Sequence, residues 1–237
     1  MAAHTAAGPG PAVPAPALLD AVLFDLDGTL IHSAPGILES FKYAFWQFGV
    51  VMNEDQLRPF MGPPLRQSFA GVLAPEEVER AVRLYRDYYA IHGQEGCCVF
   101  PGVPQMLAAL RKAGCTLCIA TSKAREVALQ VLAHYGLLDA FDYVGGASMD
   151  ASLDTKTAVL AHVLARPGLQ GKQAVMVGDR DNDMQGAADC ALPAVAAAWG
   201  YAAPGELEAW HPAYLAPDVP ALQAWLLARC IGGKRAT

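Results

Sequence analysis

Long apolar runs are missing from this 237-residue sequence. No run reaches the roughly 18 residues that a membrane-spanning helix needs, so no membrane segment is expected. An excess of positive charge is missing too, because 23 Asp and Glu residues outnumber 17 Lys and Arg residues and the net charge is −6. Without a basic stripe, nucleic acid is not an expected partner. Residues 1–18 lack the charged start and apolar centre of a signal peptide.

Metal-binding patterns of cysteine and histidine are also missing. Cys115 and Cys118 form a Cys-x-x-Cys pair, but they lie in a strand-like run that would point them to opposite faces. No second pair or histidine stands at zinc spacing, and the histidines, His32 and His134 among them, suggest no ligand set. We therefore predict reduced, mostly buried cysteines in a cytoplasmic protein. The sequence contains Cys97, Cys98, Cys115, Cys118, Cys190 and Cys230.

Apolar residues, by contrast, are plentiful enough for a sizeable core, at 54% of the chain. The length allows one large domain or a core with a smaller insertion. Residues 1–18 are rich in Ala, Pro and Gly, which predicts a disordered N-terminal tail. The sequence makes no prediction of the oligomeric state.

Short apolar runs alternate with helical patterns along much of the chain, which is typical of a parallel α/β sheet. We therefore predict the α/β class, with a doubly wound, Rossmann-like parallel sheet. Predicted strands cover 21–24, 115–120, 141–144, 174–177 and 192–197, and predicted helices cover 103–113, 124–134, 157–164, a segment from about 182, and 219–230.

Residues 34–99 interrupt this alternation. No convincing strand lies between Ser33 and Cys98, and the apolar spacing is helical. We interpret this segment as a helical insertion into the α/β core. Its predicted helices cover 35–50, 54–60, 65–73 and 75–92.

The most informative motif follows the first predicted strand, where the apolar run ends in Asp25 and Asp27 comes two residues later. Residues i and i+2 of an extended chain point to one side, at the strand end where open α/β sheets bind ligands. Converging carboxylates repel each other unless a proton or cation lies between them, so the pair suggests a divalent metal and a paired acid role. The alternative for an isolated Asp-x-Asp is a plain turn at Asp27-Gly28. The full string DLDGTL at 25–30 favours the functional interpretation.

With this string the sequence resembles the haloacid dehalogenase superfamily of phosphatases. Three further elements stand in the order and at the spacing of that family: Thr121-Ser122 after an apolar run, Lys156 before a helical segment, and GDRDND at 178–183. The combination makes a chance match very improbable.

The resemblance implies an all-helical cap, residues 34–99, inserted into a core formed by 19–33 and 100–237. Two short strings, FMGPPL at 60–65 and WGY at 199–201, resemble one branch of the family in particular. That branch holds phosphoglycolate-phosphatase-like proteins, including some described as 5′-nucleotidases.

The resemblance also implies catalytic roles. Asp25 would be the nucleophile that forms an aspartyl-phosphate, and Asp27 would be the general acid and base. Lys156 would place a positive charge on the phosphate and the nucleophile. The expected phosphate-binding residues are Thr121, Ser122, Lys156 and Gly28, with Thr121 also counted as catalytic. The expected Mg²⁺ ligands are Asp25, Asp27 (through its backbone carbonyl), Asp179 and Asp183.

Local patterns add expectations around these residues. Thr121 ends an apolar strand and Lys123 opens a helix, so Thr121 or Ser122 is expected to cap that helix and to form a phosphate site there. Arg180 could neutralise the acidic cluster, and Asp181 is expected at the start of a helix.

Substrate contacts are sought in the insertion. Met61 is one candidate, and Arg66, which follows a Gly-Pro-Pro loop, could meet an anionic group. One departure from the family pattern is Leu153, because related proteins often have an arginine three residues before the lysine.

These features predict a Mg²⁺-dependent hydrolase of phosphate monoesters that acts on a small soluble organophosphate, either phosphoglycolate or a nucleoside 5′-monophosphate. Asp27 argues against a dehalogenase, and the insertion argues against a phospho-acceptor signalling domain. A sugar-phosphate mutase of the same superfamily remains an alternative. A non-catalytic phosphate-binding protein is another, although no core residue of the motifs is missing.

Overall fold

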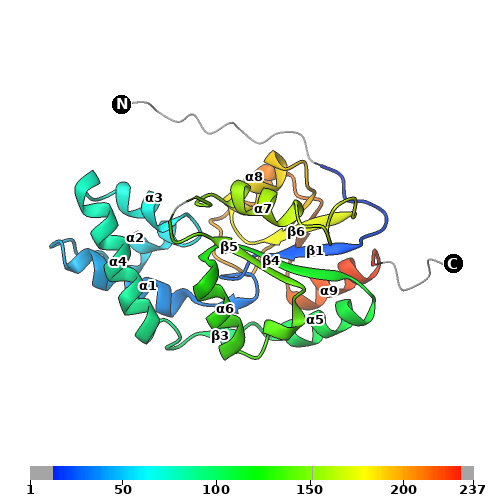
Figure 1. The fold of residues 1–237 in the computed structure, drawn as a ribbon, viewed down its shortest axis with the longest axis horizontal. Helices are drawn as coiled ribbons and strands as arrows, with labels where there is room; N and C mark the ends of the chain where they lie inside the picture. The colour runs from blue at the N-terminus through cyan, green and yellow to red at the C-terminus, as the bar shows by residue number, and fades with distance from the viewer. Residues whose placement is uncertain (1–12, 151, 231–237) are drawn as a thin grey trace.

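A six-stranded, entirely parallel sheet forms the centre of the computed structural model, which describes residues 13–150 and 152–230 (Figure 1). The spatial order is β5-β4-β1-β6-β7-β8. Renumbered within this sheet alone, that is the 3-2-1-4-5-6 order of the Rossmann fold, so the predicted doubly wound core is confirmed. The strands are β1 Ala21–Phe24, β4 Thr116–Ala124, β5 Tyr143–Ala147, β6 Ala174–Gly178, β7 Ala194–Ala197 and β8 Tyr214–Ala216.

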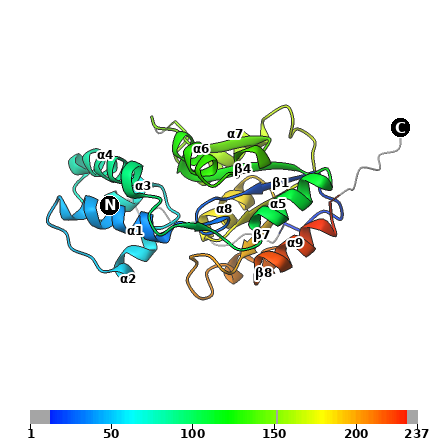
Figure 2. The ribbon, with the colours of Figure 1, turned by 90° about the horizontal axis from the view of Figure 1, so that it is seen from below.

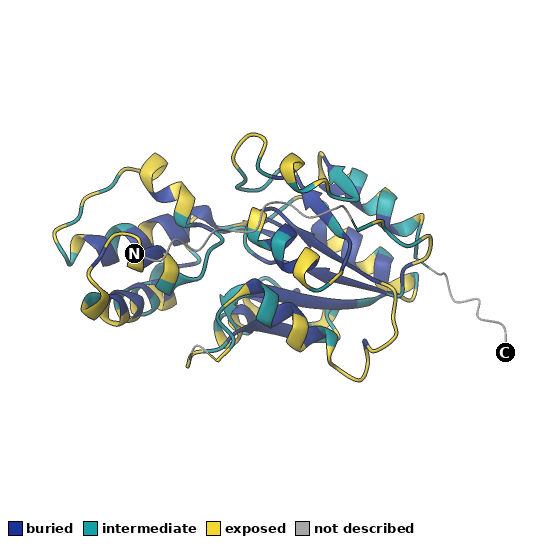
Figure 3. Ribbon diagram, turned by 90° about the horizontal axis from the view of Figure 1, so that it is seen from above, coloured by how far each residue is buried: buried dark blue, intermediate teal, exposed yellow. Residues whose placement is uncertain are grey.

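Helices cover both faces of this sheet, which explains why its central strands are continuously apolar. Val22 and Phe24 of β1 pack on one face, while Ala21 and Leu23 pack on the other. The first face is covered by α5 Val103–Lys112, α6 Arg125–His134 and α9 Val219–Leu227, and the second by α7 Lys156–Leu164 and α8 Asp181–Asp189. In Figure 3 the central strands are accordingly buried and the outer faces of the helices exposed.

The helices between β1 and α5 lie together at one end of the sheet (Figure 2). An aromatic cluster holds them together, with the ring of Phe69 5.3 Å from Phe41 and 5.0 Å from Phe45. These helices are α1 Ala34–Trp46, α2 Glu54–Leu57, α3 Leu65–Ala70 and α4 Pro75–His92, with the 3-10 turn η1 Arg58–Phe60.

The chain enters and leaves this helical group through a small antiparallel pair, β2 Ile31–His32 and β3 Cys98–Val99. We propose that this pair is the junction between a cap formed by 34–99 and a core formed by 19–33 and 100–237. Antiparallel pairing of the two crossing segments gives the insertion a defined exit from the core.

Several boundaries differ from the predicted ones. β4 runs on to Ala124, so α6 starts at Arg125 and Lys123 lies in a strand rather than opening a helix. The edge strand β8 Tyr214–Ala216 was not predicted, because three residues beside prolines have too little alternation to indicate a strand. Two 3-10 turns, η2 Leu138–Ala140 and η3 Glu208–Trp210, complete the described elements.

The prediction of reduced, mostly buried cysteines is wrong on both points. Cys115 and Cys230 are joined by a disulfide, and of the six cysteines only Cys115 and Cys118 are buried. Cys115 lies just before β4 and Cys230 just after α9, and both stand beside the start of β1. Of the remaining cysteines, Cys118 is buried, whereas Cys98 is exposed. Only the folded chain brings the two ends of this bridge together.

The predicted disordered tail at 1–18 falls mostly outside the described residues, which begin at residue 13. Among the helices that the structure describes, none is both long enough and apolar enough to span a membrane.

Candidate active site

The candidate site lies at the carboxyl edge of the sheet, where β4, β1 and β6 stand side by side. Asp25 directly follows β1, Thr121 lies near the end of β4, and Asp179 directly follows β6. Because parallel strands end at the same edge, three segments distant in sequence converge there. Between β1 and β6 the strand order also reverses direction, which is where this fold class binds its ligands.

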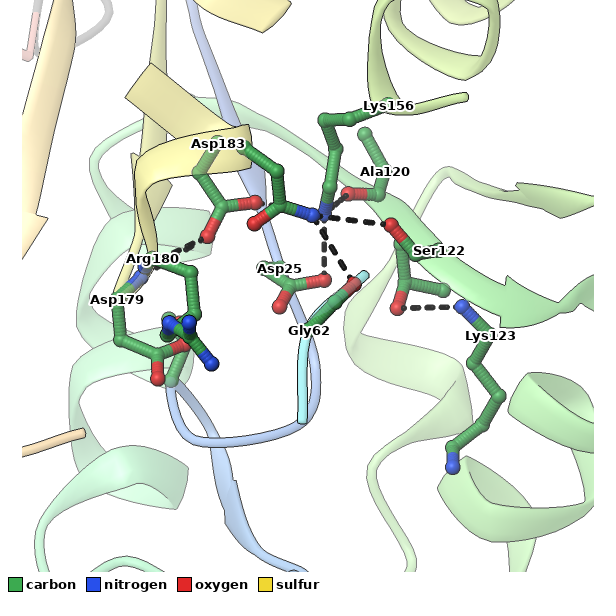
Figure 4. A network of polar contacts seen from close by, with 12 residues as sticks. Asp25, Gly62, Ala120, Ser122, Lys123, Lys156, Asp179, Arg180 and Asp183 are labelled. Atoms are coloured by element: carbon green, nitrogen blue, oxygen red, sulfur yellow. Dashed lines mark hydrogen bonds and ion pairs between the residues drawn. The ribbon is translucent and has the colours of Figure 1, made fainter. Parts of the chain in front are cut away.

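Three carboxylates form the acidic part of the site (Figure 4). Asp25, Asp179 and Asp183 each place an oxygen within 4.8 Å of the other two, and all three are buried. Burial raises the pKa of Asp25 to about 6, although the charge of Lys156 acts in the opposite direction. Burial, followed by the charges of Asp183 and Asp25, raises the pKa of Asp179 well above its ordinary value. The cluster therefore carries more negative charge than its surroundings compensate.

Lys156 supplies the positive charge within this cluster. Its Nζ donates to Asp25 Oδ1 at 2.8 Å and to the carbonyl of Ala120 at 3.0 Å, and it lies 2.7 Å from Asp183 Oδ1. Burial alone would lower the pKa of Lys156, but the charges of Asp183 and Asp25 outweigh it and raise that pKa. The lysine is therefore held in its charged form beside the predicted nucleophile.

Asp179 and Asp183 are held in place by hydrogen bonds. Thr29 Oγ1 donates to Asp179 Oδ1 and the backbone N–H of Tyr201 donates to Asp179 Oδ2, each at 2.8 Å. Asp183 Oδ2 accepts the backbone N–H groups of Asp179 and Arg180, both at 3.1 Å, at the start of α8. A carboxylate is favourable there because the helix start is electropositive.

Gly28 allows the first motif to approach this cluster closely. Its φ is +83°, and a Cβ on it would lie 2.2 Å from Asp179 Oδ2. No other residue type therefore fits without displacing an acidic side chain of the cluster.

Asp27 turns its side chain away from the acidic cluster. Its Oδ2 lies 3.0 Å from Lys123 Nζ, and this amine also donates to Tyr89 Oη of α4 at 3.1 Å. The Oδ1 atom is enclosed and has no hydrogen-bond partner in the part of the chain that the structure describes. Burial would lower the pKa of Lys123, but Asp27 together with Tyr89 and Tyr85 outweighs burial and raises that pKa. The second carboxylate of the motif is thus free of the cluster and faces the helical group.

Thr121 and Ser122 do not cap a helix, contrary to the expectation. Thr121 Oγ1 accepts the backbone N–H of Lys123 at 3.2 Å, and Ser122 Oγ accepts from the side chain of Asn182 at 3.3 Å. The register of β4 with β5 shifts between Thr121 and Ala124, so the strand continues irregularly past the two hydroxyls. Both residues still lie at the carboxyl edge beside Asp25.

Arg180 does not neutralise the acidic cluster. Its guanidinium pairs with Glu206 at 2.7 Å and also donates to the carbonyl of Met61. Asn182 donates to the neighbouring carbonyl of Gly62 at 3.0 Å. Two residues at the start of α8 thus attach the loop that precedes α3 to the core. Asp181 lies in the first turn of α8, as predicted.

The two predicted cap contacts have different surroundings. Met61 is almost fully buried, at 1% exposure. Arg66 forms ion pairs with Glu79 of α4 at 2.6 Å and with Asp154 at 3.5 Å. The anionic group that Arg66 meets is therefore part of this protein. The neighbouring Leu153 packs in the apolar cluster between the sheet, α7 and α8.

One pocket connects the carboxyl edge of the sheet with the helical group. Asp25 and Asp27 lie on its core side, together with Thr121 and Lys123. The opposite side comes from α1, α3, α4 and the loop before α3. Aromatic and charged residues of that side include Phe41, Phe60, Arg66, Tyr85, Arg86 and Tyr89.

Tyr201 is a residue of this site whose role the sequence did not reveal. Its hydroxyl accepts the backbone N–H groups of Ser33 and Ala34, at 2.8 and 2.9 Å, where α1 begins. Its own backbone N–H holds Asp179. One residue therefore links the acidic cluster to the start of the helical group. The WGY string was the available signal, but it indicated a family branch rather than a contact.

The geometry is that of a doubly wound α/β protein whose acidic and basic groups converge at the switch point of the sheet. Comparison with protein families defines the chain more narrowly. Residues 22–197 match the family model described as haloacid dehalogenase-like hydrolase. The chain therefore belongs to that family, and the resemblance predicted from its motifs is confirmed.

Curated relatives have several activities. The tyrosine-protein kinase PtkA of Mycobacterium tuberculosis is 40% identical over 76% of this chain, which spans only 62% of that relative. A 5′-nucleotidase of Pseudomonas aeruginosa is 32% identical over 85% of this chain and 93% of its own length. A phosphoglycolate phosphatase of Caulobacter vibrioides is 30% identical over 76% of this chain and 79% of its own.

A solved structure shows the same fold. The chain is similar to a predicted phosphatase from Clostridium acetobutylicum, with a TM-score of 0.84 and 34% identity. The similarity covers 89% of this chain and 99% of that structure. It supports the α/β architecture described above.

Proposed function

We propose that this protein is a Mg²⁺-dependent hydrolase of phosphate monoesters, which forms an aspartyl-phosphate on Asp25. The observation that carries this proposal is the position of Asp25. Its carboxylate lies at the switch point of the sheet, 2.8 Å from Lys156, and on the wall of the pocket shared with the helical group. The proposed substrate partner is a small soluble phosphate ester.

The donor set fits a magnesium ion. Burial, together with neighbouring carboxylates, raises the pKa of Asp25 and that of Asp179. A bound cation would therefore favour the ionised form of both groups. Carboxylate oxygens are the ligands that Mg²⁺ prefers. Asp25, Asp179 and Asp183 would hold the ion through their side chains, and Asp27 through its backbone carbonyl. When bound, Mg²⁺ would offset negative charge on the phosphate and on these carboxylates.

Individual residues of this chain then have separate roles in the reaction. Asp25 attacks phosphorus, and Lys156 holds the attacking carboxylate and balances its charge. Thr121, Ser122 and the turn at Gly28 position the phosphate oxygens. Each of the two phosphoryl transfers also needs a proton transfer. In the first a proton goes to the departing oxygen, and in the second one leaves the attacking water.

Asp27 is the proposed carrier of that proton. It gives a proton to the leaving alkoxide and later takes one from the attacking water. Its side chain is directed into the pocket and away from the three clustered carboxylates, as these two steps require. Lys123 and Tyr89 hold it in this direction.

A phosphotransferase is a second candidate, because a relative with 40% identity is a tyrosine-protein kinase. A phosphorylated Asp25 can pass its phosphoryl group to water or to a hydroxyl group in the pocket. A sugar-phosphate mutase would differ in the same respect, since its acceptor is a sugar hydroxyl. The candidates therefore share the site and differ in the acceptor.

The proposal is tested by phosphate release from a panel of small phosphate esters, with Mg²⁺ or with excess chelator. We expect turnover only with Mg²⁺ and none in Asp25→Asn, which keeps the side-chain shape but cannot attack phosphorus. The control is Asp139→Asn, at an exposed residue of η2. Wild-type turnover in folded Asp25→Asn would exclude the nucleophile. Phosphate transfer to added alcohols or tyrosine peptides, without release, would indicate the phosphotransferase.

A further inference from the structure

Arg86 of α4 lies on the pocket wall and has no partner for its charge among the residues that the structure describes. Its Nε is enclosed and has no hydrogen-bond partner in residues 13–150 and 152–230. No ion pair of its guanidinium is found among the described residues either. Buried arginine donors are normally satisfied, and an unsatisfied one needs an explanation.

The other charges of the pocket are already paired. Lys123 lies 3.0 Å from Asp27, and Arg66 lies 3.5 Å from Asp154. Asp25 is paired with Lys156, behind the pocket wall. The protein therefore provides an anion for every other lining cation, and Arg86 is the exception among the described residues.

The surroundings of Arg86 add to the imbalance. Burial, followed by the positive charge of Arg66, lowers the pKa of Arg86. Glu79, whose charge acts on the pKa of Arg86 in the opposite direction, is already engaged in a 2.6 Å ion pair with Arg66. An anion that entered the pocket would thus gain a charged donor with little competition from the protein.

We propose that Arg86 binds a second anionic group of the substrate, a carboxylate or a phosphate, at the end remote from the phosphate that Asp25 attacks. This inference rests on the proposed function and narrows its substrate class. Phosphoglycolate has such a group, whereas a nucleoside 5′-monophosphate carries an uncharged base at its remote end. Phosphate esters with two acidic ends are therefore the favoured substrates.

Matched pairs of esters test the proposal. In the carboxylate arm, 3-phosphoglycerate is compared with glycerol 3-phosphate and phosphoglycolate with 2-hydroxyethyl phosphate. In the phosphate arm, propane-1,3-diol bisphosphate is compared with 3-hydroxypropyl phosphate. We expect kcat/KM to favour the acidic member by about tenfold or more in one arm. A hydrogen bond to a charged group contributes enough free energy for such a change. The arm that shows the preference identifies the second group.

Arg86→Gln should reduce that preference towards parity, mainly through a higher KM for the acidic ester. Arg83→Gln is the matched control, because Arg83 lies on the same helix and is exposed. It should keep the wild-type preference. Equal losses for both members of a pair in Arg86→Gln, or no acid preference in either arm of the wild type, would overturn the proposal.

A binding measurement separates this proposal from the proposed hydrolase activity. Calorimetry compares phosphonoacetate with ethylphosphonate, neither of which is turned over, in the wild type and in Arg86→Gln. Tighter binding of phosphonoacetate that disappears in Arg86→Gln supports a carboxylate subsite even if no ester is hydrolysed. For the phosphate arm, propane-1,3-bisphosphonate and propylphosphonate serve in the same way. Equal affinities within both pairs would exclude the subsite, whatever the activity.

Discussion

At the residue scale, the site depends on buried carboxylates that lie closer together than their charges favour. Asp25, Asp179 and Asp183 share one small volume, and Lys156 contributes a single positive charge to it. Such a cluster is stabilised either by protons or by a cation. The dependence of protein stability on pH and on metal therefore tests whether these carboxylates lie as close together as described.

We predict that Mg²⁺ raises the melting temperature more at pH 8 than at pH 5. The raised pKa values of Asp25 and Asp179 mean that the metal-free fold binds protons more tightly than the unfolded chain. The contribution of these protons to the stability of the metal-free fold is fully present below the ordinary aspartate pKa. It is lost as pH rises through the raised pKa values of the folded protein. Mg²⁺ replaces the lost protons, so its effect grows with pH. Melting curves with and without Mg²⁺ measure this, and Asp179→Asn should reduce the difference.

Gly28→Ala should remove Mg²⁺-dependent turnover and lower the free energy of unfolding by about 1–3 kcal/mol. The new methyl group would collide with Asp179 Oδ2 and would stand at a φ of +83°. Gly136→Ala is the control, because Gly136 has a φ of +66° but a methyl group there would meet no atom within 4 Å. It isolates the cost of the backbone conformation. Equal effects of both changes on turnover would contradict the close-approach argument.

At the scale of elements, the helical group is attached to the core at defined points. The first is the pair β2–β3, through which the chain enters and leaves the helical group. The second is the start of α8, where Arg180 and Asn182 bind the loop before α3. Tyr201 adds a third point, where α1 starts. These contacts place the wall of the pocket opposite Asp25.

Tyr201→Phe tests the attachment at α1. The change removes the acceptor of two backbone N–H groups, of which that of Ser33 belongs to a residue with 1% exposure. We expect a loss of about 1–3 kcal/mol in the free energy of unfolding. Turnover should also fall, because the start of α1 is no longer attached to the residue whose backbone holds Asp179. Urea denaturation and steady-state kinetics measure the two effects. The control Tyr214→Phe changes an edge-strand tyrosine whose hydroxyl has no hydrogen bond among the described residues.

At the scale of the whole molecule, the disulfide closes the core at the edge opposite the site. Cys115 and Cys230 are 115 residues apart, and their bridge ties the start of β4 to the end of α9. A long closed loop restricts the unfolded chain strongly. The bridge therefore acts on stability, while the carboxyl edge of the sheet carries the proposed chemistry.

Reduction of this disulfide should lower the free energy of unfolding by about 2–4 kcal/mol. The measurement is chemical denaturation with and without dithiothreitol. Cys230→Ser should abolish the difference, whereas Cys190→Ser, at a cysteine outside the bridge, should keep it. A wild type that is insensitive to reduction would show that the bridge contributes nothing to stability.

The sequence by itself determined the elements whose signals are local. The helix predicted at 75–92 coincides with α4, because Pro75 with Glu76 and Glu77 forms a strong helix start and an apolar stripe follows. The apolar runs of β1 and β6 were equally clear, since both faces of these strands are buried. The motif residues at their ends followed from the same local patterns. The family resemblance ordered them into one site.

Only the tertiary structure decided which charged groups meet. Arg180 pairs with Glu206, Lys123 with Asp27, and Arg66 with Asp154, and none of these partners is indicated by sequence spacing. The same holds for the disulfide and for Arg86, whose Nε has no hydrogen-bond partner in the part of the chain that the structure describes. Periodicity reports which face of an element is buried, but a side chain's partner depends on how distant elements pack, and that is settled by the folded chain as a whole.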